Sequence, residues 1–380
     1  MLKFNFMGLT KFSVGLSFVG LVMWGQAASA YPTMTRKGYT SCSTCHYNPS
    51  GGGALTSYGK YIAKEVYGTF NDSSNAAKFI IEPNYEVGTF EEPKVVATVM
   101  ARAVQTYIDT PQITRKQVRS MQFDFEGGFA HDGWQLLGAV GPRLDSAIPG
   151  KTTKKTIDWR RYWAGRVTQE YAVRVGRFMP EFGIYHPHHN IPTRKGLFFN
   201  HNEEPEIAQA TKFTDTFDFT LGYLRGRKDT QLVDKKGYVA NVAYKTGMAR
   251  YGVSRLETKG DGATAGANGA FAQFGFGGHF YTLAEVDRKL LKDAKGKETK
   301  DDVGYLEIGN EIYKGVSPYF ALEYKKNYRY AYNVKTPSLG LQMHPLTHTE
   351  VVLQAGKVFT ELPGDKQIST QAFVMVNTYF

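Results

Sequence analysis

Cysteine is almost absent from this sequence: Cys42 and Cys45 are the only two in 380 residues. So few cysteines exclude a disulfide-stapled scaffold, and the pair needs a separate explanation. Long apolar runs are lacking too, because no stretch after residue 30 approaches the roughly 20 residues of a transmembrane helix. This lack argues against a helical membrane protein only, since a β-barrel places its apolar residues at every second position.

The first thirty residues have the layout of a secretory signal peptide. Lys3 and Lys11 supply the positive start, residues 12–24 are mainly apolar, and Ala-Ser-Ala at 28–30 fits the small-residue cleavage rule. The alternative is a membrane anchor, for which the apolar run is short. The sequence therefore predicts a signal peptide at residues 1–30 and an exported mature chain that begins at Tyr31.

The chain is basic, with a formal net charge of +11. Basic proteins favour anionic partners, such as nucleic acids or charged membrane surfaces. Because an exported protein seldom meets nucleic acid, we expect no nucleic-acid partner. Anionic lipid headgroups, or anions that pass through a pore, are the more natural partners.

Residues 79–380 have the pattern of repeated strands joined by polar or glycine-rich loops. Alternation at period two is the main sign: Tyr171, Val173 and Val175 share one face, while Arg174 lies on the other. The 24 Tyr, 25 Phe and 40 Gly suit a barrel with aromatic girdles. We therefore predict an all-β fold, an antiparallel transmembrane β-barrel of about 14 strands (12–16 possible) in the cell outer membrane. A soluble all-β domain is the alternative.

The two cysteines belong to the sequence Cys-Ser-Thr-Cys-His at residues 42–46, which matches the C-x-x-C-H attachment motif of c-type haem. Two thiols at this spacing reach the two vinyl groups on one edge of the porphyrin, and His46 is then held under the iron as its proximal ligand. A thioredoxin-like redox pair would need a βαβ context, and a zinc site would need two more ligands. The sequence therefore predicts one covalent haem c held by Cys42, Cys45 and His46.

These residues resemble a group of Gram-negative outer-membrane proteins in which an N-terminal monohaem c-type motif precedes a β-barrel. The likeness rests on the motif at 42–46, on Asn-Pro-Ser-Gly-Gly-Gly at 48–53, on Tyr-Gly-Lys at 58–60 and on the terminal Phe380. A final phenylalanine on a last strand resembles the signal that outer-membrane assembly machinery reads. The resemblance implies the architecture of haem plus barrel and leaves the role of the protein open.

The haem-binding segment, residues 31–78, is expected to be mostly irregular or helical and is short for a self-contained cytochrome, because small domains bury proportionally little surface. We therefore expect it to lean on the barrel, either as a plug in the lumen or as a cap on the periplasmic mouth. Strand parity also predicts a set of charged residues that face the lumen: Arg102, Asp124, Glu126, Arg174, Glu307, Glu311, Glu323 and Lys325. Their mixed signs indicate a hydrated interior, open or plugged.

No methionine follows the motif within this segment, so the sixth iron ligand has no obvious candidate there. A non-strand connection from Met179 to about Lys212 contains three clustered histidines, and long loops often carry function. Our hypothesis is that His186 or His188, ahead of His189, supplies the distal iron ligand. The alternatives are solvated surface histidines or an adventitious metal site.

The main functional hypothesis is electron transfer at or across the outer membrane. One haem cannot bridge a hydrocarbon core about 25 Å tall, so we expect periplasmic electron carriers or other cytochromes as partners, beside outer-membrane lipid. One alternative is a porin-like transport barrel with a haem-bearing plug; another is a haem enzyme or sensor with an open sixth position. An electron-transfer protein is favoured over a catalyst, because the sequence has no nucleophile triad, acid pair or P-loop.

Overall fold

The computed structural model describes residues 32–49, 51–69, 94–111, 113–144, 155–185, 191–199, 203–227, 232, 235–346 and 349–379. The predicted signal peptide and the predicted domain boundary near residue 79 lie outside the described residues. The distal-ligand candidates His186, His188 and His189, and the terminal Phe380, also lie outside them.

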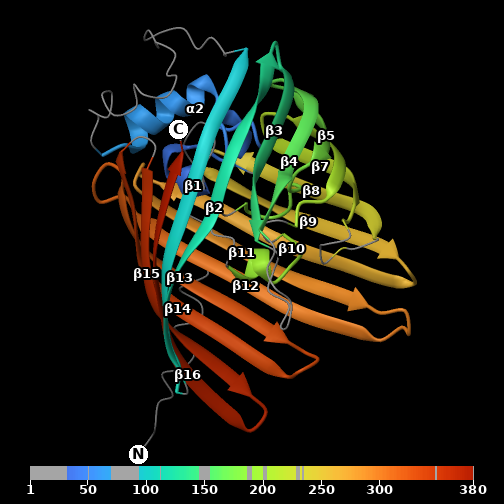
Figure 1. The fold of residues 1–380 in the computed structure, drawn as a ribbon, viewed down its shortest axis with the longest axis vertical. Coiled ribbons are helices and arrows are strands. Elements are labelled where there is room, and N and C mark those ends of the chain that lie inside the picture. The colour runs from blue at the N-terminus through green and yellow to red at the C-terminus, as the bar shows by residue number, and fades with distance from the viewer. Residues whose placement is uncertain are drawn as a thin grey trace, which may run out of the picture.

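Sixteen antiparallel strands form one closed barrel in which consecutive strands are neighbours (Figure 1). The barrel closes where β1 pairs with β16, with Met100 beside Tyr379. The strands are β1 (Val95–Asp109), β2 (Thr114–His131), β3 (Trp134–Leu144), β4 (Lys155–Val167), β5 (Tyr171–Arg177), β6 (Glu206–Phe213), β7 (Phe217–Arg225), β8 (Lys236–Thr246), β9 (Ala249–Gly260), β10 (Ala263–Phe276), β11 (Phe280–Lys292), β12 (Glu298–Asn310), β13 (Val316–Asn327), β14 (Tyr332–Leu346), β15 (Thr349–Leu362) and β16 (Asp365–Tyr379). The predicted all-β antiparallel barrel is confirmed.

The barrel has sixteen strands, two more than the predicted number of about 14 and at the upper end of the predicted range of 12–16. The predicted non-strand connection also ends too late, because residues 206–213 form β6 rather than loop. Strand β6 turns Gln209 and Thr211 inward, where both are buried. Its outer face holds the small residues Ala208 and Ala210, so it lacks the strong apolar alternation of a strand such as β7.

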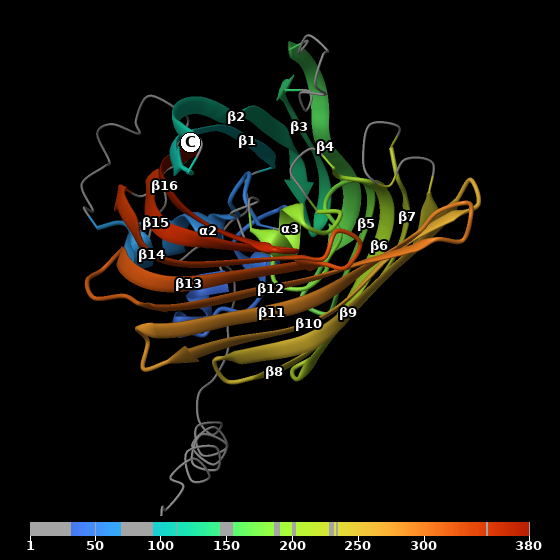
Figure 2. The ribbon, with the colours of Figure 1, turned by 90° about the horizontal axis from the view of Figure 1, so that it is seen from below.

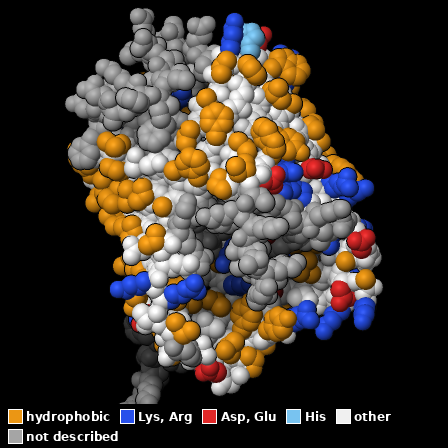
Figure 3. Space-filling model, viewed as in Figure 1, with side chains coloured by type: hydrophobic (Ala, Val, Ile, Leu, Met, Phe, Trp, Pro, Cys, Tyr) orange, Lys and Arg blue, Asp and Glu red, His pale blue; other side chains and the backbone are white. Residues whose placement is uncertain are grey.

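Strand β7 shows why such segments become the wall of a barrel. Its side chains alternate strictly, and Leu221 and Tyr223 point outward with 62% and 60% of their surface exposed. Asp218 and Thr220 lie on the inner face and are buried. Figure 3 shows apolar side chains spread over the outer wall in the same way. An apolar outer face around a polar interior is the reverse of a soluble sandwich and suits a lipid surrounding.

The two ends of the barrel differ in their connections. At one end, here the short-turn end, two to five residues join the strands. One of these turns is formed by Asp132 and Gly133, between β2 and β3. Their φ values of 55° and 80° are positive, as a two-residue hairpin turn requires. At the other end, the long-loop end, residues 178–205 connect β5 to β6. In outer-membrane barrels, short turns face the periplasm and long loops face the exterior.

Two stretches of chain lie within the ring of strands (Figure 2). The N-terminal segment, residues 32–49 and 51–69, contains η1 (Pro32–Lys37), η2 (Cys42–Thr44), α2 (Ser57–Ile62) and η3 (Ala63–Tyr67), and η1 packs on β10 and β11. The inward segment, residues 178–185 and 191–199, follows β5, and its α3 (Pro192–Lys195) contacts β11, β12 and β13. None of the helices in the described part of the chain is long and apolar enough to cross a membrane.

Candidate functional site in the barrel lumen

The motif at residues 42–46 folds into one tight turn. The backbone N–H groups of Cys45 and His46 both donate to the Cys42 carbonyl, at 3.2 Å and 3.0 Å. His46 then pairs with Leu55 in an isolated β-bridge, and the Tyr47 N–H donates to the Ala54 carbonyl at 3.1 Å, so the chain returns to the turn at Leu55. Cys42 and Cys45, both within the described residues, are not joined in a disulfide. The two thiols and the imidazole therefore project from a single turn of backbone.

Helix α2 supports this turn from behind. The Thr56 hydroxyl donates to the Thr44 carbonyl at 2.9 Å and accepts from the Gly59 N–H at 3.0 Å, which caps the helix. A Cβ atom on Gly59 would overlap the Cys45 carbonyl, so only glycine allows this close approach. The Tyr-Gly-Lys sequence at 58–60 thus has a packing role directly behind the cysteine motif.

The His46 imidazole is buried inside the barrel. Burial in the barrel lowers its pKa to about 4, and the nearby Arg161 guanidinium acts in the same direction, against the backbone of Gly53 and Gly52. The ring is therefore neutral at pH 7, which is the form that binds iron. Its Nδ1 atom is buried and has no hydrogen-bond partner among the described residues.

The two thiols are protonated at neutral pH. Burial raises the pKa of Cys42 to about 11, although Arg250 and Arg194 act against this rise. Burial and the neighbouring Cys42 raise the pKa of Cys45 to about 12. A catalytic dithiol would have a lowered thiol pKa, so the electrostatics of the pair are not those of a thiol–disulfide exchange site.

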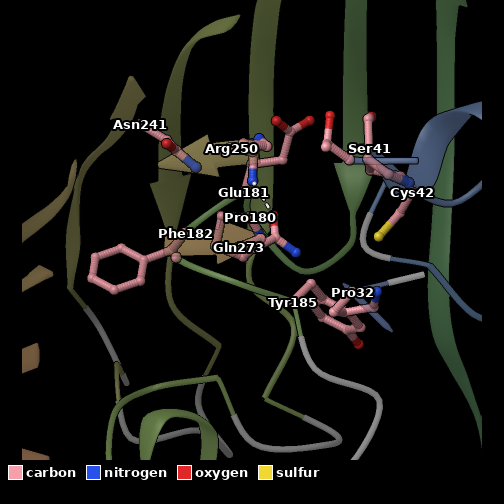
Figure 4. A pocket seen from close by; sticks show the side chains of 13 residues that line it. Pro32, Ser41, Cys42, Pro180, Glu181, Phe182, Tyr185, Asn241, Arg250 and Gln273 are labelled. Atoms are coloured by element: carbon pink, nitrogen blue, oxygen red, sulfur yellow. Dashed lines mark hydrogen bonds between the residues drawn. The ribbon is translucent and has the colours of Figure 1, made fainter. Parts of the chain in front are cut away.

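A hollow that is partly open to solvent lies beside Cys42. The N-terminal segment, the inward segment and the inner faces of β8, β9 and β10 enclose it. The Cys42 thiol and the Gln273 amide point into it from opposite sides (Figure 4). Phe182 contributes apolar surface, while Glu181 and Arg250 contribute charge. The motif therefore opens onto a mixed apolar and polar hollow inside the barrel.

The residues present fit a c-type haem. Two thiols and a neutral imidazole come from one turn, and the first thiol borders the cavity. At Gly51, a Cβ atom would lie 3.4 Å from Cys42 Sγ and 4.0 Å from His46 Cδ2, so glycine leaves both groups uncrowded. A bare metal ion is a different matter, since the described residues contain no cluster of three or more His, Cys, Asp or Glu side chains suited to one.

Ion pairs on the inner wall face the motif loop. Arg161 of β4 holds Glu126 of β2 through two hydrogen bonds of 2.9 Å and 2.6 Å, and Arg160 lies 2.5 Å from Asp124. Two successive arginines face inward because the pairing register of β3 and β4 shifts between Ala139 and Val140. A bulge of this kind breaks the strict in-and-out alternation of a strand.

The charged residues that strand parity predicted to face the lumen are buried or half-buried in the structure. Asp124, Glu126, Arg174, Glu307 and Glu311 are all at least 95% buried, and Arg102, Glu323 and Lys325 are half-buried. Sequence reasoning missed Arg160 and Arg161, because the bulge hides them from a parity argument, and it missed Glu181 and Arg250 of the cavity. No periodic signal could have marked Glu181, since it lies in the irregular inward segment.

The inward segment carries the chain to the cavity just ahead of the distal-ligand candidates. Tyr185, the last described residue before His186, lines the cavity beside Cys42. Arg194 anchors the segment: it is 1% exposed, donates to the Phe182 and Ile184 carbonyls, and lies over the Tyr185 ring at 4.8 Å. The connection that sequence analysis singled out for its histidines therefore belongs to the lumen up to residue 185.

No protein-family model and no curated protein sequence matches the chain. Among solved structures, it is similar to the anion-selective porin from Comamonas acidovorans, with 12% identity and a TM-score of 0.54 over 75% of this chain and 99% of that one. It is also similar to in-vitro folded OmpT of Vibrio cholerae (11% identity, TM-score 0.56, 77% and 100% covered). A third similar structure is the outer membrane channel DcaP of Acinetobacter baumannii, with 9% identity and a TM-score of 0.53 over 75% of this chain and 97% of that one. The chain therefore has a porin-like outer-membrane β-barrel fold.

Proposed function

We propose that this chain is a porin-like outer-membrane barrel whose lumen holds a haem-bearing plug. One observation carries the proposal: the C-x-x-C-H turn lies inside the ring of strands and borders an internal cavity. Contacts with the wall support the plug, including the ion pairs of Arg36 and Lys37 with Glu311 at 3.4 Å and 2.6 Å. The connection lengths favour an orientation with the N-terminal segment toward the periplasm, since its Thr69 bonds the turn between β12 and β13.

In this proposal Cys42 and Cys45 form thioethers with the porphyrin, and His46 is the proximal iron ligand. The bound haem supplies reversible one-electron chemistry. The surrounding protein keeps His46 neutral, encloses the motif turn and limits access of water to it. A site of this kind supports electron transfer at the outer membrane, with periplasmic electron carriers or other cytochromes as partners.

Optical spectra recorded with and without carbon monoxide, together with a redox titration, test this function. We expect the purified exported protein to contain one covalent, six-coordinate haem that does not bind carbon monoxide. If His186 or His188 is the distal ligand, its replacement by alanine opens the sixth position and permits carbon monoxide binding, whereas His189→Ala does not. Carbon monoxide binding by the unmodified protein would instead indicate a haem enzyme or sensor.

Solute transport is the second candidate, and the porin-like barrel favours it. The Comamonas protein is an anion-selective porin, and this chain also places arginines on its inner wall, among them Arg160, Arg161 and Arg174. With the N-terminal segment seated, the cavity is bounded by both inserted segments. Transport would therefore require the plug to move, which a conductance measurement detects.

A lipid location is tested at Leu221, the middle residue of β7, which is 62% exposed on the outer wall. We expect Leu221→Arg to lower the free energy of unfolding in phospholipid vesicles by about 2–4 kcal/mol, because a cation at the bilayer midplane is poorly solvated. Urea titration of vesicle-folded protein measures this cost, with Leu221→Phe as the apolar control. Equal stability of the arginine variant and the control would mean that lipid does not cover this wall.

A further inference from the structure

We propose that Glu126 and Arg161 of the barrel wall are positioning residues of the haem site, which hold the glycine loop around His46 and set the charge next to it. This inference rests on the proposed function and deepens it. Under this proposal two parts of the chain form the site. The motif supplies the covalent links, and the barrel wall supplies the polar surroundings of the proximal ligand.

The loop that follows the motif is built for close contact with His46. Gly51, Gly52 and Gly53 have φ values of 75°, 68° and 73°, three successive left-handed residues that side chains would disfavour. The Asn48 amide donates to the Gly51 carbonyl at 2.8 Å and closes the turn. Gly51 passes the imidazole without crowding it, as described above. The loop therefore wraps the proximal ligand with backbone alone.

The far side of this loop rests on the barrel wall through one carboxylate. Glu126 Oε1 accepts the Ala54 N–H at 3.1 Å, while Glu126 Oε2 accepts both hydrogen bonds from Arg161. A Cβ atom on Gly53 would overlap the Glu126 carboxylate and crowd the Arg161 guanidinium. Glu126 is fully buried and Arg161 is 9% exposed. The ion pair is thus pressed against the loop and shielded from water, so its charges are weakly screened.

The ion pair lies against the loop that encloses His46. Glu126 accepts the Ala54 N–H, and Leu55, the next residue, pairs with His46 in a β-bridge. The charges of Glu126 and Arg161 therefore act in the immediate surroundings of the imidazole. A positive charge near an iron ligand disfavours the more positive, oxidised iron and raises the reduction potential. A negative charge does the reverse. Removal of the two partners should therefore shift the potential in opposite directions, which loss of packing alone would not do.

Redox titration of purified, exported, haem-bearing variants tests the proposal. With Arg161→Met, we expect the ratio of reduced to oxidised protein at a fixed potential to fall by about tenfold, equivalent to 59 mV for one electron. With Glu126→Gln, we expect a shift of similar size in the opposite direction. Arg161→Lys keeps the charge and is expected to stay near the unmodified value, as is the double variant Glu126→Gln with Arg161→Met.

A matched control is Arg288→Met, which breaks the exposed pair with Asp302 (2.7 Å) on β11 and β12 and should leave the potential unchanged. If Arg161→Met is not recovered folded, Glu126→Gln and the neutral double variant still decide the sign. Haem-bearing variants that keep the unmodified potential, or that both shift it in one direction, overturn the positioning role. An unmodified protein without haem overturns the proposed function itself, and this inference with it.

Discussion

Exported protein in which Cys42 and Cys45 are both replaced by alanine is expected to be colourless and to lack the added mass of a porphyrin. Without either thiol no thioether can form, and His46 alone is one ligand that does not retain the cofactor through purification. The barrel is expected to assemble nonetheless, because its sixteen strands pair without help from either cysteine. Visible spectra and intact mass of the purified protein measure the outcome.

Ser43→Ala is the matched control, since it changes the same turn and leaves C-x-x-C-H intact. The Ser43 hydroxyl hydrogen-bonds the neighbouring Ser41 hydroxyl at 3.0 Å, within the same turn, so its loss should leave colour and mass unchanged. Single replacement of Cys42 or Cys45 leaves one thioether possible and should give partial loading. An unmodified protein without porphyrin mass, or a double variant that keeps it, would contradict the assignment.

Glu311→Ala is expected to release the N-terminal segment from the lumen. Glu311 lies between β12 and β13 and pairs with Arg36 and Lys37, and Arg36 is only 1% exposed. Removal of one partner from a buried ion pair costs about 3–5 kcal/mol, because a buried cation loses its counter-charge. The undocked population should rise by at least about a hundredfold, which protease accessibility of residues 32–69 and conductance in planar bilayers report.

The control for this variant is Glu257→Ala, which removes an exposed partner of Arg255 on β9 and should leave conductance unchanged. Acid offers an independent check. Burial acts to raise the pKa of Glu311, but Arg36 and Lys37 outweigh it and hold the pKa below its ordinary 4.5. The docking energy from Glu311 is therefore complete above pH 4.5 and is lost as the pH falls through the lowered value. Glu311→Ala protein with a protected segment and unchanged conductance would show that these ion pairs do not seat the plug.

Much of the barrel can be predicted from the sequence, because aromatic and β-branched residues at every second position indicate a strand with an apolar outer face and a polar inner face. Strands such as β5 and β7 show this clearly. The alternation is weak at β6, whose outer face holds small residues such as Ala208 and Ala210. It fails at Arg160, where a bulge turns two neighbouring residues to the same side.

The C-x-x-C-H motif, from which the haem site is proposed, needs no tertiary information, because Cys42, Cys45 and His46 lie within five residues. The barrel residues around the motif could not be predicted in this way. Glu126 and Arg161 are 35 positions apart and lie on β2 and β4, and Arg250 comes from β9. Only closure of the barrel brings them around the N-terminal segment.

The sequence by itself determined the local features: strand periodicity, the attachment motif and the glycine-rich turn that follows it. Each depends on spacings of a few residues, which bond geometry translates directly into structure. Tertiary structure alone decided that the motif turn sits inside the lumen and which wall charges meet it. Those contacts join residues that lie far apart in the sequence, and their energy depends on burial that exists only once the sixteen strands enclose the N-terminal segment.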